Sequence, residues 1–388
     1  MFRIGQEEKE AVARVIDSKE MFKINSAERE TEQCEEKLRE LFGVRRSLLV
    51  TSGTAALTGA LIGMGIGPGD EVIVPAYTYI ATAMAVVLAG AIPVIADIDD
   101  SLTISPLEIE KKLSPRTKCI IPVHIQGFPC DMDAIMKIAK KHGLFVLEDA
   151  CQADGGSYKG RRLGTIGDAG ALSFNQFKII TAGEGGALLT DNEAIFERAL
   201  IYHDASAIAF FGNQLDGITE PQFCGTEFRV NEISSAILRQ QLLKLDGILF
   251  DLRKNKKALE QALGGRFKIG RSNDPEGDCG TTLPLVFASE KKAREFCAAS
   301  DIGAYLPIDT GKHIYCNWTA ILEKRGAFNP KMDPFRHPDN APFVPDYANE
   351  TYPATLDLLA RTAYILINPD WTAEDIKSVA EKAVSAIQ

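Results

Sequence analysis

The sequence predicts an α/β protein with a mainly parallel central sheet and a smaller C-terminal α+β domain. Short apolar runs alternate with helical patterns over residues 48–150, which is typical of parallel strands covered by helices on both faces. A single long helical pattern begins after Asn231, and the last third of the chain mixes shorter strands and helices. We therefore expect N-terminal helices and a large domain over residues 1–264, and a small domain over residues 265–388.

Each element has its own sequence signal. Amphipathic patterns rich in Glu and Lys predict helices at 5–18 and 27–42. Apolar runs then predict strands, and longer periodic runs predict helices between them. The expected strands are 48–52, 71–76, 92–98, 118–125 and 144–150, and the expected helices are 53–65, 79–90 and 131–143. A final helix at 372–387 begins with Thr372 and Asp375, which resemble a capping box.

Composition restricts the classes of partner. The chain has 388 residues, of which 45% are hydrophobic and 25% charged, as in an ordinary globular protein. Its net charge of −10 disfavours nucleic acid and anionic membranes as partners. The eight cysteines are scattered, which favours free thiols in a reducing compartment. We find neither a signal-peptide pattern nor an apolar run of membrane-spanning length, so we expect a cytoplasmic protein.

An acid and a lysine are the central chemical candidates. Asp149 ends an apolar strand, and Lys178 lies in an uncharged stretch beside Phe177 and Ile179. In isolation, Asp149 could cap a helix and Lys178 could be a surface lysine. Together they are the groups that a pyridoxal phosphate enzyme needs: the lysine holds the cofactor as a Schiff base, and the acid keeps the pyridine nitrogen protonated.

A phosphate site is predicted where the first strand meets its helix. Thr51-Ser52-Gly53-Thr54 opens that helix, and free backbone N–H groups with the helix dipole favour an anion there. Ser and Thr also cap ordinary helices, so the pattern gains weight only beside Asp149 and Lys178. Gly53, Thr54 and Ser173 form our expected phosphate-binding set.

Three runs carry a resemblance to a known family. They are Glu148-Asp149-Ala150-Cys151-Gln152-Ala153, Ser173-Phe174-x-x-x-Lys178 and Gly183-Glu184-Gly185-Gly186. In order and spacing they resemble the DegT/DnrJ/EryC1/StrS sugar aminotransferases, and the resemblance covers nearly the whole chain. It implies an aspartate-aminotransferase-like fold (fold type I), pyridoxal 5'-phosphate as cofactor with pyridoxamine phosphate as intermediate, and a homodimer with shared active sites.

The resemblance also assigns roles to single residues. It implies that Lys178 forms the internal aldimine and shuttles a proton, and that Asp149 pairs with the pyridinium nitrogen. Gln152 would lie near the ring hydroxyl, and Tyr79 would stack on the ring, although a core tyrosine is the simpler interpretation. The Gly-rich run predicts a tight turn of positive φ beside Lys178.

Two positions depart from the family pattern. Glu227 stands where the family usually has an Asn that reaches the cofactor phosphate of the neighbouring subunit, so we expect Glu227 to face the substrate instead. Asp154 stands where the family often has His, and we assign it no role. Long loops are expected at 203–224 and 307–346, and Lys312 and His313 in the second loop are candidate substrate contacts. The five histidines show no metal-ligand spacing.

The implied reaction moves an amino group from an amino acid, best L-glutamate, to a keto- or aldehyde-sugar. The runs FNQFK, GTEFR and GKHIYCNW are most similar to family members that aminate C8 of an oxidised 3-deoxy-manno-octulosonate for lipopolysaccharide. Alternatives are a nucleotide-sugar or cyclitol aminotransferase, an aminohydroxybenzoate synthase-like enzyme and a sugar dehydratase, although the resemblance implies histidine in place of the lysine in such dehydratases. A pyridoxal-phosphate-binding sensor is the non-enzyme alternative.

Overall fold

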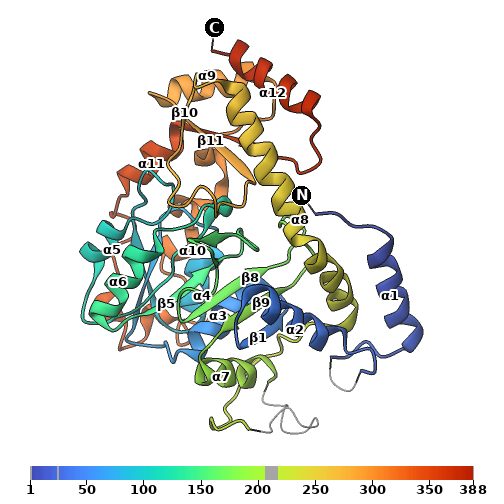
Figure 1. The fold of residues 1–388 in the computed structure, drawn as a ribbon. Helices are drawn as coiled ribbons and strands as arrows, with labels where there is room; N and C mark the ends of the chain where they lie inside the picture. Colours follow the sequence, from blue (N-terminus) through green and yellow to red (C-terminus); the bar gives the residue numbers. More distant parts are fainter. Residues whose placement is uncertain (1, 24–25, 206–216, 388) are drawn as a thin grey trace.

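A seven-stranded sheet forms the centre of the computed structural model, which describes residues 2–23, 26–205 and 217–387 (Figure 1). Its strand order is β1-β9-β8-β5-β4-β2-β3. The strands are β1 (Arg46–Val50), β2 (Glu71–Pro75), β3 (Ile92–Ala96), β4 (Thr117–Ile120), β5 (Phe145–Asp149), β8 (Ala169–Ser173) and β9 (Gly186–Thr190).

Strand direction determines where the functional edge lies. β9 pairs antiparallel with both β8 and β1, and the remaining pairs are parallel. All strands except β9 therefore end at the same edge of the sheet. Pro75, Asp149 and Ser173 are the last residues of β2, β5 and β8, and Thr51 follows β1 directly. The mainly parallel sheet of the prediction is confirmed, with one antiparallel strand inside it.

Helices cover both faces of this sheet. They include α3 (Gly53–Gly63), α4 (Ala81–Leu88), α5 (Pro106–Lys112), α6 (Met132–His142) and α7 (Glu193–His203). Successive residues of β2 alternate between two apolar clusters, with Ile73 in one and Val72 and Val74 in the other. This alternation explains the continuous apolar runs of the sequence, because a strand that is buried on both faces has no polar side.

A long helix, α8 (Glu232–Leu263), runs from the large sheet to the small one (Figure 1). Its cap is Asn231, whose side chain accepts a hydrogen bond from the backbone N–H of Ser234 at 2.9 Å. The N-terminal helices α1 (Gln6–Ser18) and α2 (Glu30–Phe42) both pack against α8. The Glu232 carboxylate accepts the first N–H groups of α2, so α8 also anchors that helix.

The C-terminal part is built on a three-stranded antiparallel sheet of β10 (Lys268–Ile269), β11 (Thr282–Val286) and β12 (Thr362–Leu366). It carries α9 (Glu290–Ser300), α11 (Pro353–Ala360) and α12 (Ala373–Ser385). Thr372 and Asp375 form the expected capping box of α12. A small two-stranded ribbon, β6 (Ser157–Tyr158) and β7 (Arg161–Arg162), follows β5.

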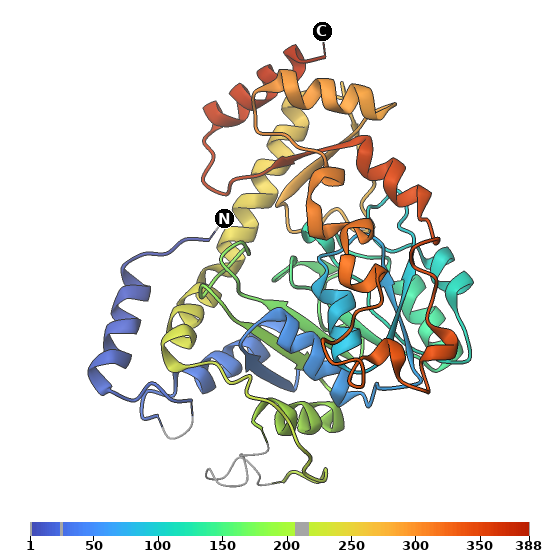
Figure 2. The ribbon, with the colours of Figure 1, turned by 180° about the vertical axis from the view of Figure 1, so that it is seen from behind.

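The segment 307–346 differs from the open loop that we expected. It folds into short helices, because buried apolar residues fix it to the large sheet: Ile314, Tyr315 and Trp318 belong to the same apolar cluster as Val74 (Figure 2). Its elements are η4 (Pro307–Asp309), η5 (Gly311–His313), η6 (Tyr315–Asn317), α10 (Thr319–Leu322), η7 (Pro334–Arg336) and η8 (Ala341–Phe343).

Two expectations on chain organisation stay predictions. Gly264 ends α8 in a left-handed conformation, where we expected the domain boundary, although the segment 307–346 returns to the large sheet. In the expected loop at 203–224, residues 206–216 lie outside the described residues. Within the described part of the chain, no helix is long and apolar enough to cross a membrane.

Candidate active site

A cavity of about 590 Å³ lies at the carboxyl edge of the large sheet. It brings together residues that follow or end five strands and a residue of η5, all far apart in the sequence. Predicted residues that line it are Gly53, Thr54, Tyr79, Asp149, Gln152, Ser173, Lys178 and His313. Residues that the sequence analysis did not assign to a site also line it, among them Ser52, Thr82, Cys151, Asn175 and Glu184.

Lys178 lies in the turn between β8 and β9. The turn is closed by backbone hydrogen bonds from Phe174 to Gly185 at 2.9 Å and from Gln176 to Gly183 at 3.0 Å. Gly183 and Gly185 have φ values of 84° and 149°, which L side chains rarely adopt. The predicted tight glycine turn beside the lysine is therefore confirmed.

Asp149 is buried and fixed by two donors. The Thr82 hydroxyl donates to Oδ2 at 2.7 Å, and the backbone N–H of Cys151 donates to Oδ1 at 3.2 Å. Thr82 also exchanges a hydrogen bond with Thr78 at 2.7 Å. The sequence analysis did not single out Thr82, although two threonines four residues apart, at the start of an otherwise apolar helix, were the available signal.

The expected binding site for the cofactor phosphate is the N-terminus of α3. Ser52 caps this helix and accepts a hydrogen bond from the backbone N–H of Ala55 at 3.1 Å, which leaves the N–H groups of the first turn directed at the cavity. A Cβ atom on Gly53 would lie 2.7 Å from Cys151 Sγ and 2.9 Å from Ser173 Cβ. Only glycine allows this helix end to lie so close to β8.

A buried hydrogen bond between a histidine and a carboxylate supports the strand end that carries Asp149. Glu148 and His124 are both fully buried, with Glu148 Oε2 3.0 Å from His124 Nε2. The backbone N–H of Cys130 donates to His124 Nδ1, so that nitrogen carries no proton and Nε2–H donates to Glu148. Glu148 also accepts the backbone N–H groups of Gly164, Ile166 and Gly167. His124 thus has a structural role, because it fixes the strand end that carries Asp149.

Tyr79 and His313 form one wall of the cavity. Their ring centroids are 5.3 Å apart, with an interplanar angle of 55°. Tyr79 is 44% exposed, so its ring is available for stacking and is not a core tyrosine. Burial lowers the pKa of His313, which is therefore neutral near pH 7. Lys312 is exposed and does not line the cavity.

Glu227 lies outside the cavity of its own chain. It pairs with Arg229, which also pairs with the buried Asp204. Its side chain is 50% exposed. Within this chain Arg229 is thus held in a structural ion pair.

Asp154 is the least expected residue near the site. It is fully buried, and neither carboxyl oxygen has a hydrogen-bond partner in the described structure. Burial raises its pKa well above the ordinary value, while the positive charge of Lys178 acts in the opposite direction. The pattern of the sequence gave no reason to expect a buried acid beside Lys178.

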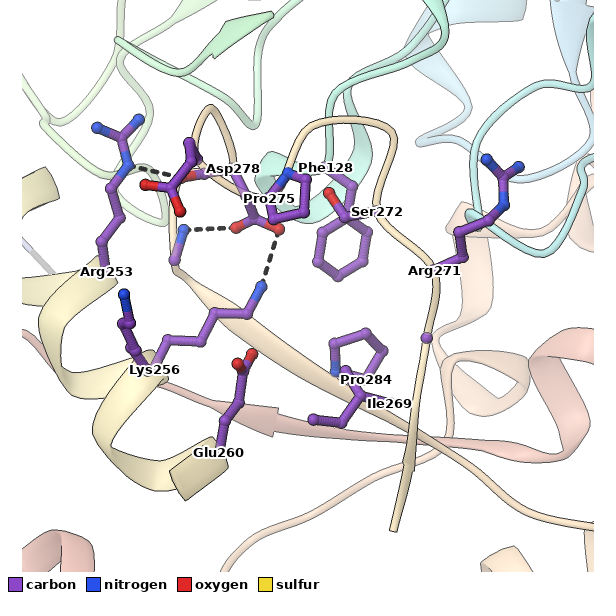
Figure 3. Close-up of a pocket in the computed structure, with 14 residues that line it drawn as sticks. Phe128, Arg253, Lys256, Glu260, Ile269, Arg271, Ser272, Pro275, Asp278 and Pro284 are labelled. Atoms are coloured by element: carbon purple, nitrogen blue, oxygen red, sulfur yellow. Dashed lines mark hydrogen bonds and ion pairs between the residues drawn. The ribbon is translucent and has the colours of Figure 1, made fainter. Parts of the chain in front are cut away.

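Two further cavities lie near the candidate site. One of about 190 Å³ shares Gln152, Phe177, Lys178 and His313 with the main cavity, and also touches Gln126. The other, of about 300 Å³, lies between α8 and the small sheet (Figure 3). It contains no residue of the main cavity.

The residues of the main cavity fit pyridoxal 5'-phosphate. An amine, a buried carboxylate, an aromatic ring and a helix N-terminus are the groups that its aldehyde, pyridine nitrogen, ring and phosphate require. Glycine at position 53 leaves the space that a phosphate would need beside Ser173.

Comparisons with known proteins agree with this fit. The profile of the DegT/DnrJ/EryC1/StrS aminotransferase family matches residues 3–296. The spore coat polysaccharide biosynthesis protein SpsC of Bacillus subtilis (strain 168) is 31% identical over 97% of this chain and 94% of its own. The dTDP-3-amino-3,4,6-trideoxy-alpha-D-glucose transaminase of Streptomyces venezuelae is 42% identical over 51% of this chain and 50% of its own.

Solved structures share the fold. The S. venezuelae protein DesV, determined in complex with a ketimine intermediate, superposes with a TM-score of 0.79 at 27% identity, covering 98% of this chain and 95% of DesV. The predicted aspartate-aminotransferase-like fold is confirmed. The chain belongs to the DegT/DnrJ/EryC1/StrS aminotransferase family and is a pyridoxal-phosphate-dependent aminotransferase.

Proposed function

We propose that this enzyme transfers the amino group of an amino acid, best L-glutamate, to a keto or aldehyde carbon of a sugar in the cavity around Lys178. The observation that carries the proposal is the convergence of Lys178, Asp149 and the N-terminus of α3 on one cavity. Bound pyridoxal phosphate supplies an electron sink for the carbon that gains or loses the amine.

Lys178 and Asp149 have the proton-handling roles in this proposal. Lys178 holds the cofactor covalently and then carries a proton at Nζ to and from the reacting carbon. Asp149 keeps a proton on the pyridine nitrogen, and its donors Thr82 and Cys151 N–H stabilise the charged form of its carboxylate.

The remaining lining residues bind and orient. Gly53, Thr54 and Ser173 receive the phosphate, Tyr79 stacks on the ring, and Gln152 lies at the ring hydroxyl. His313, being neutral, offers a hydrogen bond to substrate rather than a charge. Lys312 does not line the cavity but is exposed next to His313 in the chain, where its ammonium can attract an anionic substrate.

A homodimer with shared sites is part of the proposal. Phe177, adjacent to Lys178 and lining both active-site cavities, is 82% exposed in the single chain. A large exposed aromatic at the mouth of a site is typical of a surface that a partner covers. A second subunit would also give Glu227 a site to face, since it reaches none in its own chain.

For the acceptor, we propose the C8 aldehyde of an oxidised 3-deoxy-manno-octulosonate as the first candidate. The runs around Lys178, Glu227 and Lys312 support it, and the exposed ammonium of Lys312 suits the sugar's carboxylate. A nucleotide-linked sugar is the second candidate, because the transaminase from S. venezuelae takes its name from one.

The test is the visible spectrum of purified enzyme with pyridoxal phosphate, recorded before and after addition of L-glutamate. We expect loss of the lysine-bound cofactor absorbance and one equivalent of 2-oxoglutarate, then recovery of the absorbance when the correct sugar is added. Lys178→Ala should lack the covalent absorbance, whereas Lys291→Ala, an exposed lysine of α9, should behave as wild type.

Three results would contradict the proposal at different points. A persistent covalent absorbance in Lys178→Ala would remove Lys178 from its role. An unchanged spectrum after glutamate would exclude that donor and favour the dehydratase or sensor alternatives. Recovery with a nucleotide-linked keto-sugar but not with the octulosonate aldehyde would replace the first candidate by the second.

A further inference from the structure

A small cavity adjoins the proposed site and belongs to both sheets of the molecule. Its volume is about 190 Å³, and it is bounded by Lys178 on one side and by Thr281 and Leu366 of the C-terminal part on the other. The inference below rests on the proposed function, because it concerns the part of the sugar that enters this space.

Gln126 has an unusual backbone at the wall of this cavity. Its φ and ψ are 53° and 23°, in the left-handed region that residues other than glycine seldom occupy. Such conformations cost free energy, persist only where the surroundings impose them, and cluster at ligand-binding sites. Gln126 is therefore held in place by its neighbours.

Three hydrogen bonds hold it. The Gln126 N–H donates to Gln152 Oε1 at 3.1 Å, and the Thr281 hydroxyl donates to the Gln126 carbonyl at 2.5 Å. The Thr282 hydroxyl donates to Gln126 Oε1 at 3.0 Å. The side chain is thus oriented from the small sheet, while the backbone is tied to a residue of the main cavity.

The segment that carries these threonines is itself fixed. Lys256 of α8 donates to the Asp278 carboxylate at 2.8 Å, and Arg253 donates to the Asp278 carbonyl at 2.7 Å (Figure 3). A Cβ atom on Gly127 would lie 2.6 Å from Cys279 Cβ, so the two segments are in close contact. The orientation of Gln126 is therefore set before substrate binds.

The free atom of this side chain is a donor. Because Oε1 already accepts from Thr282, the amide group offers Nε2, which has no acceptor among the described residues. Lys178 is the only cationic side chain lining this cavity in the described structure, and His313 is neutral because burial lowers its pKa. Lys178 is engaged with the reacting carbon in the proposed function, so a carboxylate or phosphate here would lose hydration without a cation of its own in return.

We propose that Gln126 determines acceptor specificity by donating an amide hydrogen bond from Nε2 to a hydroxyl oxygen of the sugar. An uncharged donor at this position recognises a hydroxyl-bearing carbon chain, and it leaves the anionic group of the sugar to other parts of the site. Sites built to hydrogen-bond a substrate hydroxyl reject analogues that lack it.

The experiment separates the two half-reactions. Gln126→Met keeps length and removes the donor, and Gln33→Met on the exposed face of α2 is the matched control. Stopped-flow spectra measure the donor half-reaction with L-glutamate. The sugar half-reaction is measured forward with the octulosonate aldehyde and in reverse with dTDP-3-amino-3,4,6-trideoxyglucose. We expect Gln126→Met to lower kcat/KM for the sugar about 10- to 100-fold and to change the glutamate step less than about twofold.

Two further variants test the details. Thr282→Val should reproduce part of the loss, because it frees the side chain without removing the amide. Gln126→Glu should retain more sugar activity than Gln126→Met, because a carboxylate still accepts a hydrogen bond from a hydroxyl. If Gln126→Glu is the worse variant, the group recognised is an anion and the hydroxyl assignment is wrong.

Other outcomes also decide whether Gln126 recognises the sugar. Equal losses in both half-reactions would show that Gln126 only supports the fold, and unchanged sugar kinetics would remove it from recognition. If wild-type enzyme converts neither sugar, the proposed function fails, and the inference fails with it. Normal wild-type turnover with an unaffected Gln126→Met overturns the inference alone.

Discussion

At the scale of single residues, the site depends on how two buried carboxyl groups are partnered. Asp149 has two donors, whereas Asp154 has none in the described structure. Burial without a partner raises the pKa of Asp154, so this acid favours its proton. The two acids near Lys178 therefore differ in their hydrogen bonding, and each can be tested by its own amide variant.

Asp149→Asn tests the first of these acids. The amide cannot hold the pyridine nitrogen in its protonated form, so we expect cofactor binding to survive and transamination to slow by about two orders of magnitude or more. Cofactor affinity by titration and single-turnover rates with L-glutamate measure the two effects. A normal rate would show that Asp149 does not act on the ring nitrogen.

Asp154→Asn tests the second acid through pH. Folding raises the pKa of Asp154, so the folded state binds more protons than the unfolded state above pH 4, and wild-type stability falls as pH rises. Asparagine does not titrate, so the free energy of unfolding of the variant should exceed that of wild type by about 1–3 kcal/mol at pH 8 and by less at pH 5.

Thermal unfolding at the two pH values measures this difference. Asp17→Asn, on the exposed part of α1, is the control and should show no such trend. If the variant is more stable than wild type by the same amount at both pH values, Asp154 is ionised in the folded protein throughout this range.

At the scale of elements, the N-terminus of α3 is the most constrained feature. Gly53→Ala would place a Cβ atom 2.7 Å from Cys151 Sγ, so the helix end must move away from Ser173. We expect a loss of about 1–3 kcal/mol in stability and weaker binding of pyridoxal phosphate.

The same helix provides the control. A Cβ atom on Gly59 would meet nothing within 4 Å, so Gly59→Ala should be neutral or stabilising by up to about 1 kcal/mol. Unfolding curves and cofactor titrations of both variants decide the matter. Equal cofactor affinity in both would place the phosphate elsewhere.

At the scale of the whole molecule, α8 joins the parts that build the site. It packs against α1, α2 and α12, and through Lys256 it fixes the segment that reaches Gln126. Movement of the small sheet relative to the large one would therefore change the small cavity, because it is lined by Thr281 and Leu366 as well as Lys178.

The assembly predicted for this molecule is a homodimer. Light scattering should give about twice the chain mass of 42.3 kDa. Phe177→Ser should weaken dimerisation or lower activity, because the exposed ring loses its apolar contact with the partner. Phe328→Ser, which changes another exposed ring that lines neither cavity, is the control. A fully active monomer would exclude shared sites.

Local patterns in the chain were sufficient for much of this protein. Alternating apolar runs specified the parallel sheet, and turn glycines beside Lys178 specified a conformation that only glycine adopts freely. Asp149, Ser173 and Lys178 were recognisable because strand ends and spacing are encoded by neighbouring residues. These features depend on contacts that are short along the chain.

Contacts between distant segments decided the rest. Packing between segments that are far apart in the sequence determines four features. They are the short helices of 307–346, the hydrogen bond from Thr82 to Asp149, the burial of Asp154 and the hydrogen bonds that hold Gln126. The local periodicity of a sequence does not predict which side chains from different strands are in contact at the edge of a sheet. Three-dimensional packing alone sets the partners of Asp149, the isolation of Asp154 and the direction of Gln126, because burial and hydrogen bonding there come from residues up to 156 positions away.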